Sequence, residues 1–300
     1  MNKRHISVLL NESIDALNIK DHGTYVDATF GAGGHTREIL KRMNGGRVFA
    51  FDQDPVAFKN IDQDILKDSR FQMIPKNFNT LNESLDAFQV NHIDGILFDL
   101  GMSSMHIDHP ERGFSYMQDG PLDMRMNPNQ MLTADIVLNT YSHEALLRIF
   151  RDYGDIKLPH KFANFVISNR PYHTTFDVVK MTDQWFKKAS GHSAKAVFQA
   201  VRIEVNQELQ VIHEVLTQAL DRLHKHGRLV VISFHSLEDR LVKQFIKKHS
   251  ETQTPKGLPM MNESLLLKKI TIKPMTPTQE EMEINSRSRS AKMRVAEKAF

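Results

Sequence analysis

The sequence predicts an α/β fold in which a doubly wound parallel sheet is interrupted by a helical insertion. Two observations carry this prediction. Short apolar runs alternate with helical stretches over residues 24–98, and the alternation returns after residue 205. Between residues 107 and 205, helical periodicity and proline-punctuated loops replace the strand pattern. We therefore expect a core formed by residues 1–106 and 206–300, and an insertion domain of residues 107–205 after the fourth strand.

Four strands are expected in the N-terminal part. Apolar runs place them at residues 24–29, 47–51, 71–74 and 93–98. A helix is predicted over residues 35–43, after a glycine turn, and another begins at Pro55, because proline suits the first helical turn. Strands separated by helices predict a parallel sheet with right-handed crossovers.

The C-terminal part is expected to complete the sheet. The pattern predicts a helix over residues 205–226, a fifth strand over 227–234, and final strands over 265–272 and 291–296. Ser236 is expected to cap the next helix, with Asp239 three residues later as a variant of the capping box. Residues 252–259 and 273–285 are expected to form loops.

The composition is that of an ordinary globular protein. The chain has 40% hydrophobic and 25% charged residues, a net charge of +3 and no cysteine, which excludes disulfides, thiolate metal sites and cysteine nucleophiles. No run approaches the roughly 20 apolar residues of a membrane span, and the N-terminus lacks the apolar core of a secretory signal. We expect a cytoplasmic protein with no membrane contact. Local basic clusters at 187–188, 243–248 and 287–294 are either nucleic-acid contacts or solvated faces.

A glycine turn and two strand-end acids predict a cofactor cleft. Residues 31–34, Gly-Ala-Gly-Gly, follow a strand and open a helix, where backbone can approach a nucleotide-like ligand. Asp52 ends the second strand, where a carboxylate can accept both ribose hydroxyls. Thr36 occupies the position of the third glycine of a dinucleotide fingerprint, which favours S-adenosylmethionine because that ligand has no pyrophosphate. A purely structural tight turn is the alternative.

Asp99 is the most informative of the acids. It follows the apolar run 96–98, which lies between Gly95 and Gly101 and predicts a strand covered on both faces. Ligands of open α/β sheets bind beyond the carboxyl ends of strands, so Asp99 is a candidate site residue. Its alternative role is to cap the next helix.

Other residues near this cleft have two interpretations each. Phe78 follows the third strand and either packs on an adenine ring or belongs to the core. His35 and His106 are polar residues beside the cleft, or structural histidines. The remaining histidines show no ligand spacing, so no metal is predicted.

Several sequence motifs resemble those of the bacterial ribosomal RNA small-subunit methyltransferase H family. They are spread in order over nearly the whole chain, at residues 5–12, 30–36, 99–104, 111–116, 121–126, 198–206, 233–240 and 287–297. The resemblance implies a Rossmann-like, S-adenosylmethionine-dependent methyltransferase. The family's activity is methylation of the exocyclic N4 amine of a cytidine in the decoding centre of 16S rRNA.

The resemblance also implies site residues and partners. The family's cofactor-binding positions fall on Gly33, Gly34, His35, Asp52, Phe78, Asp99 and His106. The implied partner is 16S rRNA, within the small ribosomal subunit. A homodimer is left open.

Chemistry adds expectations for the substrate. The N4 lone pair of cytosine is delocalised into the ring, so a carboxylate that accepts an N4 hydrogen bond would favour attack on the methyl group. Asp99 is either that acceptor, and so the candidate catalytic residue, or only a cofactor ligand. Phe114 and Tyr116 either stack on an unstacked base or pack the insertion. Arg112 and Arg125 either bind phosphates or bridge to nearby acids.

The chain departs from the family's usual pattern at Ile156, Asn164 and Ala196. These departures lie in the insertion, which is expected to recognise the substrate, and leave the cofactor residues unchanged. They keep open a paralogue with another RNA, DNA or protein substrate. A different class of alternative is a catalytically silent RNA-binding or assembly factor that retains the cofactor fold.

Overall fold

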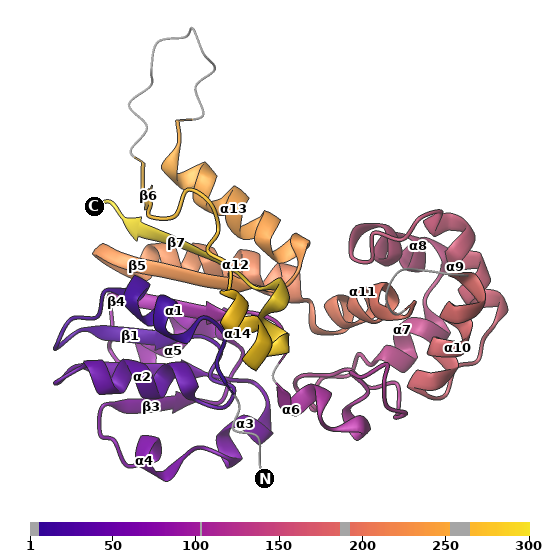
Figure 1. Cartoon of the computed structure of the whole chain (residues 1–300), viewed down its shortest axis with the longest axis horizontal. Helices are drawn as coiled ribbons and strands as arrows, with labels where there is room; N and C mark the ends of the chain where they lie inside the picture. Colours follow the sequence, from indigo (N-terminus) through magenta and orange to yellow (C-terminus); the bar gives the residue numbers. More distant parts are fainter. Residues whose placement is uncertain (1–5, 103, 187–192, 253–264) are drawn as a thin grey trace, which may run out of the picture. The chain divides into compact units, whose positions relative to one another are not determined.

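The computed structural model describes residues 6–102, 104–186, 193–252 and 265–300. They form two compact units, one of residues 1–101 with 209–300 and one of residues 102–208 (Figure 1). The expected domain boundaries were 106/107 and 205/206. None of the helices in these ranges is long and apolar enough to cross a membrane.

A seven-stranded sheet organises the first unit and confirms the predicted α/β fold. The strand order is β3-β2-β1-β4-β5-β7-β6, with β1–β5 parallel and β7 antiparallel to both neighbours. The strands are β1 (Thr24–Asp27), β2 (Arg47–Phe51), β3 (Phe71–Ile74), β4 (Ile93–Asp99), β5 (Leu223–Ser233), β6 (Leu267–Lys269) and β7 (Lys292–Lys298). The strand order reverses between β1 and β4, and such switch points are where open α/β sheets bind ligands.

Helices cover both faces of this sheet because successive strand residues point to opposite faces. Val26, Ile96 and Val231 pack into one core with α5, α12 and α13. Tyr25, Leu97 and Val230 are also buried, on the opposite face. The helices of the first unit are α1 (Leu10–Leu17), α2 (Gly34–Arg42), α3 (Pro55–Lys59), α4 (Gln63–Leu66), α5 (Leu81–Ala87), α12 (Glu208–Arg222), α13 (Ser236–Ser250) and α14 (Gln279–Ile284), with 3-10 turns η1 (Phe78–Thr80) and η3 (Ser286–Ser290).

The second unit is helical along the residues that the structure describes. It contains α6 (Ser104–Ile107), η2 (Pro110–Arg112), α7 (Ala134–Thr140), α8 (His143–Asp152), α9 (Pro159–Ser168), α10 (Thr175–Trp185) and α11 (Lys195–Asn206). A separate core fills it, in which Phe150 and Phe162 are completely buried and lie edge to face at 4.8 Å. The expected absence of a strand pattern after β4 therefore reflects an independent helical core.

The predicted helix over residues 205–226 was wrong at both ends. Gln207 has a φ of 51°, in the left-handed region, and separates α11 from α12. The helix α12 stops at Arg222, and β5 already begins at Leu223, which pairs with Ile93 of β4. Sheet pairing overrides helical periodicity here, because tertiary contacts outweigh local propensity.

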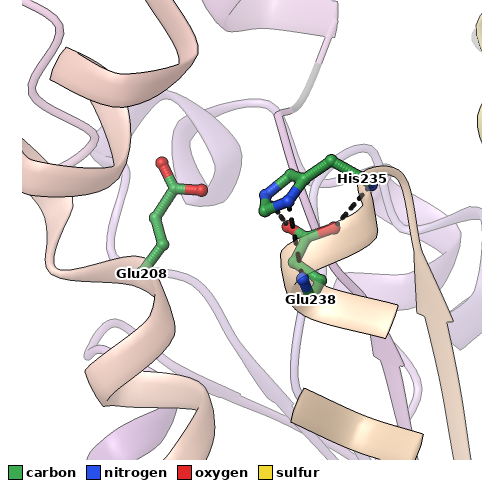
Figure 2. A group of neighbouring side chains, drawn as sticks. All are labelled: Glu208, His235 and Glu238. Atoms are coloured by element: carbon green, nitrogen blue, oxygen red, sulfur yellow. Dashed lines mark hydrogen bonds and ion pairs between the residues drawn. The ribbon is translucent and has the colours of Figure 1, made fainter. Parts of the chain in front are cut away.

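The predicted cap of α13 was also wrong. His235, not Ser236, is the N-cap, and Glu238 rather than Asp239 completes the capping box. Glu238 Oε2 accepts hydrogen bonds from the backbone amides of Phe234 (2.8 Å) and His235 (3.2 Å), and Glu238 Oε1 lies 3.1 Å from His235 Nε2 (Figure 2). Extended backbone at His235 starts the helix one residue earlier than expected.

The two loops predicted in the C-terminal part compare differently with the structure. Residues 273–285 contain α14, which begins after a Thr278 cap, so the prediction of a loop was wrong there. The loop predicted over residues 252–259 lies outside the described residues, apart from Thr252. The helix α14 contacts the start of the chain, because Glu281 Oε1 accepts the amide hydrogen of Leu9 at 2.8 Å.

Candidate functional site

Three acidic residues end neighbouring strands at one edge of the sheet. Asp27 ends β1, Asp52 follows β2 and Asp99 ends β4. These strands are adjacent and parallel, so their carboxyl ends meet at the same edge. The structure therefore brings Asp52 and Asp99 together with the glycine turn that follows β1.

The glycine turn has a backbone that only glycine adopts readily. Gly31 and Gly33 have φ angles of +53° and +75°, and Gly33 is the N-cap of α2. A Cβ atom on Gly33 would lie 2.7 Å from the Phe30 ring. Sterics thus require glycine here, and the backbone at the start of α2 stays open to close approach by a ligand.

Asp52 holds this turn in place. Its Oδ2 accepts the amide hydrogen of Gly31 at 2.9 Å, and its Oδ1 accepts that of Asp54 at 2.9 Å. Each carboxylate oxygen has two lone pairs, so these bonds leave capacity to accept hydroxyl hydrogens. One residue can therefore fix the glycine turn and bind a ribose.

Asp99 has a buried carboxylate oxygen with unused bonding capacity. Its amide donates to Thr29 Oγ1 at 2.7 Å, whereas Oδ1 is buried and has no hydrogen-bond partner among the described residues. Burial raises the pKa of Asp99 well above its usual value, and the negative charges of Asp27, Glu238 and Glu281 raise it further. Such a site suits a ligand that donates hydrogen bonds and carries positive charge.

His35 is a neutral neighbour of Asp99. Burial lowers the pKa of His35 to about 4, against the opposing effect of its hydrogen bond to Val8. Its Nε2 lies 3.2 Å from the Val8 carbonyl oxygen, which can only accept, so Nε2 carries the hydrogen and Nδ1 is an acceptor. The 3.9 Å approach of Nδ1 to Asp99 Oδ2 is therefore no ion pair at neutral pH.

Asp27 is a supporting residue that sequence reasoning missed. It is completely buried, and it accepts hydrogen bonds from the Thr29 amide (3.1 Å) and the Thr36 hydroxyl (2.7 Å). Burial raises its pKa. Thr36, noted in the sequence only as a missing glycine, thus ties α2 to the end of β1. An acid at the end of the strand before the glycine turn was the available signal.

Phe78 begins η1, directly after the loop that follows β3. Its ring meets Phe98 edge to face, with centroids 5.8 Å apart, and it packs on the core while staying half-buried. The core contact is therefore present. Part of the ring is still exposed, so the contact with adenine stays a prediction.

His106, Phe114 and Tyr116 belong to the second unit. His106 and Phe114 are buried, and their rings stack with centroids 4.9 Å apart. Tyr116 packs edge-on against Phe198 at 5.7 Å. For Phe114 this geometry favours packing of the insertion over a stacking surface for a base.

Arg112 and Arg125, the candidate phosphate-binding arginines, bind backbone and acid groups. Arg125 makes a bidentate pair with Asp123 and donates to the carbonyl oxygens of Pro128 and Gln130. Arg112 donates to the carbonyl oxygens of Arg125 (2.9 Å) and Met126 (3.1 Å). Arg125 therefore follows the bridging alternative, with its guanidinium engaged on several sides.

Comparison with known proteins gives the family. A family model described as the MraW methylase family matches residues 2–299. The chain is 49% identical over 296 residues to "Ribosomal RNA small subunit methyltransferase H 1" of Acholeplasma laidlawii, covering 98% of this chain and 99% of the relative. It is 49% identical over 302 residues to the methyltransferase H of Onion yellows phytoplasma, covering 99% of each. For Clostridium botulinum methyltransferase H the identity is 44% over 308 residues, covering 99% and 100%.

The full-length match to a methylase family is consistent with the strand-end acids and with the glycine turn that they hold. The chain belongs to the MraW methylase family.

Proposed function

We propose that the protein transfers the methyl group of S-adenosylmethionine to the exocyclic N4 amine of a cytidine in the decoding centre of 16S rRNA. The names of the curated relatives support a ribosomal RNA substrate in the small subunit. The choice of a cytidine in the decoding centre rests on the resemblance of the sequence motifs to that family. The observation that carries the proposal is the buried Asp99 Oδ1, which has no hydrogen-bond partner among the described residues and lies at the same sheet edge as Asp52 and the glycine turn.

The residues of the first unit fit this cofactor. The sulfonium and ammonium groups of S-adenosylmethionine are positive, and the surroundings of Asp99 contain acids and a neutral histidine. Asp52 can accept the ribose hydroxyls, the glycine turn admits close approach of the ligand, and Phe78 offers a half-buried ring for the adenine. In this proposal Gly33, Gly34 and His35 complete the binding surface of the first unit, whereas His106 stays a prediction from the family resemblance.

When bound, the cofactor supplies a methyl group that its sulfonium already activates. It would supply that carbon to the N4 nitrogen and leave the electron pair of the carbon–sulfur bond on sulfur, and the amine would release one proton to solvent. Asp99 would orient the amine by accepting an N4 hydrogen bond. Positioning supplies most of the acceleration in such a reaction, because the leaving group needs no further activation.

The second unit would recognise the RNA. Half-buried Tyr116 is a stronger candidate than buried Phe114 for contact with the base, and Arg112 and Arg125 stay candidates for the phosphates. The cytidine must leave its stack to reach the methyl group. A cytoplasmic enzyme that acts on the small ribosomal subunit is part of the proposal.

Methyl transfer to small ribosomal subunits tests the proposal. Subunits are prepared from a strain that lacks this gene, incubated with the purified protein and labelled S-adenosylmethionine, and their 16S rRNA is mapped by mass spectrometry. We expect one labelled cytidine in the decoding centre, carrying the methyl group on N4. Label elsewhere, or on another atom, would refute the substrate assignment.

Calorimetry separates the enzyme from a silent binding factor. We expect heat of binding on titration with S-adenosylmethionine, and its loss in Asp52→Ala. The control Asp68→Ala removes an acid that pairs with Arg70 and lies outside the site, so it should bind the cofactor like the unmodified protein. No heat in the unmodified protein would favour the silent factor.

A further inference from the structure

A basic pocket in the first unit is not used by the proposed methyl transfer. It lies between α13, β6 and β7, which run side by side (Figure 1), and its volume is about 230 Å³. Its lining residues are Lys243, Ile246, Lys247, Glu251, Lys269, Thr271, Ile272 and Arg294. Four of them are cationic at neutral pH and one is anionic. None of them belongs to the strand-end site.

The acid that lines the pocket, Glu251, and a second acid near it, Asp239, are engaged in ion pairs. Asp239 of α13 binds Arg294 at 2.7 Å and lies 3.9 Å from Lys292. Glu251 pairs with Lys269 and lies 3.9 Å from Lys247. These acids hold the cations of the sheet edge and the end of α13 in place, and the lining keeps a net positive charge because it has four cations and one anion.

The exposed charge lies along one face of α13. Arg240, Lys243 and Lys247 are exposed, and their spacing of three and four residues places them on the same side of the helix. Within the described ranges, Arg240 and Lys243 have no ion-pair partner. Lys268 of β6 is exposed as well. Arg240 and Lys243 thus add positive charge without an ion pair to this face of α13, beside Lys247, which Glu251 pairs.

The apolar part of the pocket indicates how a ligand would lie. Ile246 is buried, whereas Ile272 is 89% exposed. Among the described residues no aromatic side chain lines the pocket, so they offer aliphatic contact beside positive charge and no surface for base stacking. This combination suits a sugar–phosphate chain more than a base.

We propose that this basic pocket binds the sugar–phosphate backbone of RNA without regard to sequence. Phosphate contacts of this kind position a nucleic acid, while the reaction site selects the base. The inference rests on the proposed function for its choice of RNA as the partner. It adds a second contact surface, distinct from the helical insertion.

Salt-dependent binding of a polyuridine oligonucleotide tests the pocket. Each phosphate contact with a single strand contributes about 0.7 to the slope of log affinity against log salt. We expect Lys243→Gln/Lys247→Gln to lower that slope by about 1.4 and to weaken binding several-fold at low salt. Lys243→Arg should keep the slope. The matched control is Lys67→Gln/Lys225→Gln, two exposed lysines outside the pocket that have no ion pair along the described chain and should leave binding unchanged.

A change of opposite sign sharpens the test. Glu251→Gln removes the anion of the pocket and releases Lys247 and Lys269, so RNA affinity should rise. Unchanged heat of S-adenosylmethionine binding confirms that each variant is folded. Equal slopes for the double-lysine variant and its control would overturn the proposal, as would a loss of affinity in Glu251→Gln.

The two proposals can fail separately. On small ribosomal subunits, the double-lysine variant should show a raised KM and an unchanged kcat. If the unmodified protein methylates the subunits but the lysine variants keep the full salt slope, the pocket assignment fails alone. If the slope changes but no subunit is methylated, the proposed reaction fails alone.

Sedimentation with phosphatidylglycerol vesicles tests the other phosphate source. Vesicle binding that needs Lys243 and Lys247, with unchanged RNA binding, would assign the pocket to lipid and overturn the RNA proposal.

Discussion

At the scale of single residues, Asp99 combines burial with a cluster of negative charge. Its raised pKa means that ionising this carboxyl in the folded protein costs free energy, and no cation among the described residues offsets that cost. Such a site lowers the free energy of unfolding of the protein until a suitable ligand binds. A single substitution of Asp99 should therefore raise stability and weaken ligand binding.

We expect Asp99→Asn to stabilise the protein without ligand and to abolish or weaken cofactor binding. A carboxyl with a raised folded pKa destabilises the folded state at every pH above the unfolded pKa, so at pH 7 its removal should raise the free energy of unfolding. Urea unfolding and calorimetry with S-adenosylmethionine measure the two effects. A destabilised variant that binds the cofactor normally would contradict the role given to Asp99.

His35 makes stability depend on pH in the acid range. Its pKa is about 4 in the folded protein, against an ordinary value of 6.5 for histidine, so the unfolded chain takes up the proton first. Its stabilising contribution is complete above pH 6.5 and is lost as pH falls through 4, with a total of about 3 kcal/mol. We expect His35→Gln to flatten unfolding free energy against pH between 6.5 and 4. Because buried Asp27 and Asp99 titrate with the opposite sign in both proteins, the difference between the two curves isolates His35. Parallel curves would refute the assignment.

At the scale of secondary structure, the start of α13 depends on a buried carboxylate. Glu238 is 1% exposed and satisfies the amides of Phe234 and His235, which follow β5 directly. The adjoining strand β4 carries Asp99 at the position paired with Ile232. This capping box therefore fixes the backbone next to the candidate site.

Substitutions at this cap distinguish the observed geometry from the one predicted by the sequence. Glu238→Ala leaves two amides without their acceptor and should destabilise the protein by about 1–3 kcal/mol. The control Ser236→Ala removes an exposed hydroxyl and should change stability by less than about 0.5 kcal/mol. Chemical denaturation measures both. If Ser236 were the cap, its substitution would cost about 1 kcal/mol.

At the scale of the whole molecule, two separate hydrophobic cores stabilise the two units. The first core lies between the sheet and α5, α12 and α13, and the second lies among α7–α11. The single tryptophan of the chain, Trp185, packs against Phe162 and Phe165 in the second core. Its fluorescence therefore reports the second unit.

We expect Phe162→Ala to lower the midpoint of the unfolding transition seen by Trp185 fluorescence. Loss of a fully buried phenylalanine costs about 3–5 kcal/mol. S-adenosylmethionine, by contrast, should stabilise the first unit through mass action and raise a transition followed by circular dichroism of the sheet. Phe98→Ala, in the first core, is the matched substitution and should lower that transition instead. One common transition that both substitutions shift equally would show that the units unfold together.

The α/β class, the place of the helical insertion and the glycine turn could be predicted from the sequence. Apolar runs marked β1–β4, and the glycine turn with its strand-end acids marked the edge where a ligand would bind. These features are local: a buried strand needs consecutive apolar residues, and a left-handed turn needs glycine. The same local signals failed where distant chain segments compete, as at Leu223, which joins β5 through pairing with β4 although its surroundings have helical periodicity.

The tertiary structure, in contrast, shows which polar groups have hydrogen-bond partners. It placed Asp27 and Thr36 in one hydrogen bond, left Asp99 Oδ1 without a partner among the described residues, and engaged Arg125 with Asp123. It also moved the cap of α13 to His235 and gathered the lysines of α13 and β6 around one pocket. Burial and pairing depend on contacts between residues far apart in the chain, so the spacing of charged residues cannot reveal which of them remain free to bind a ligand.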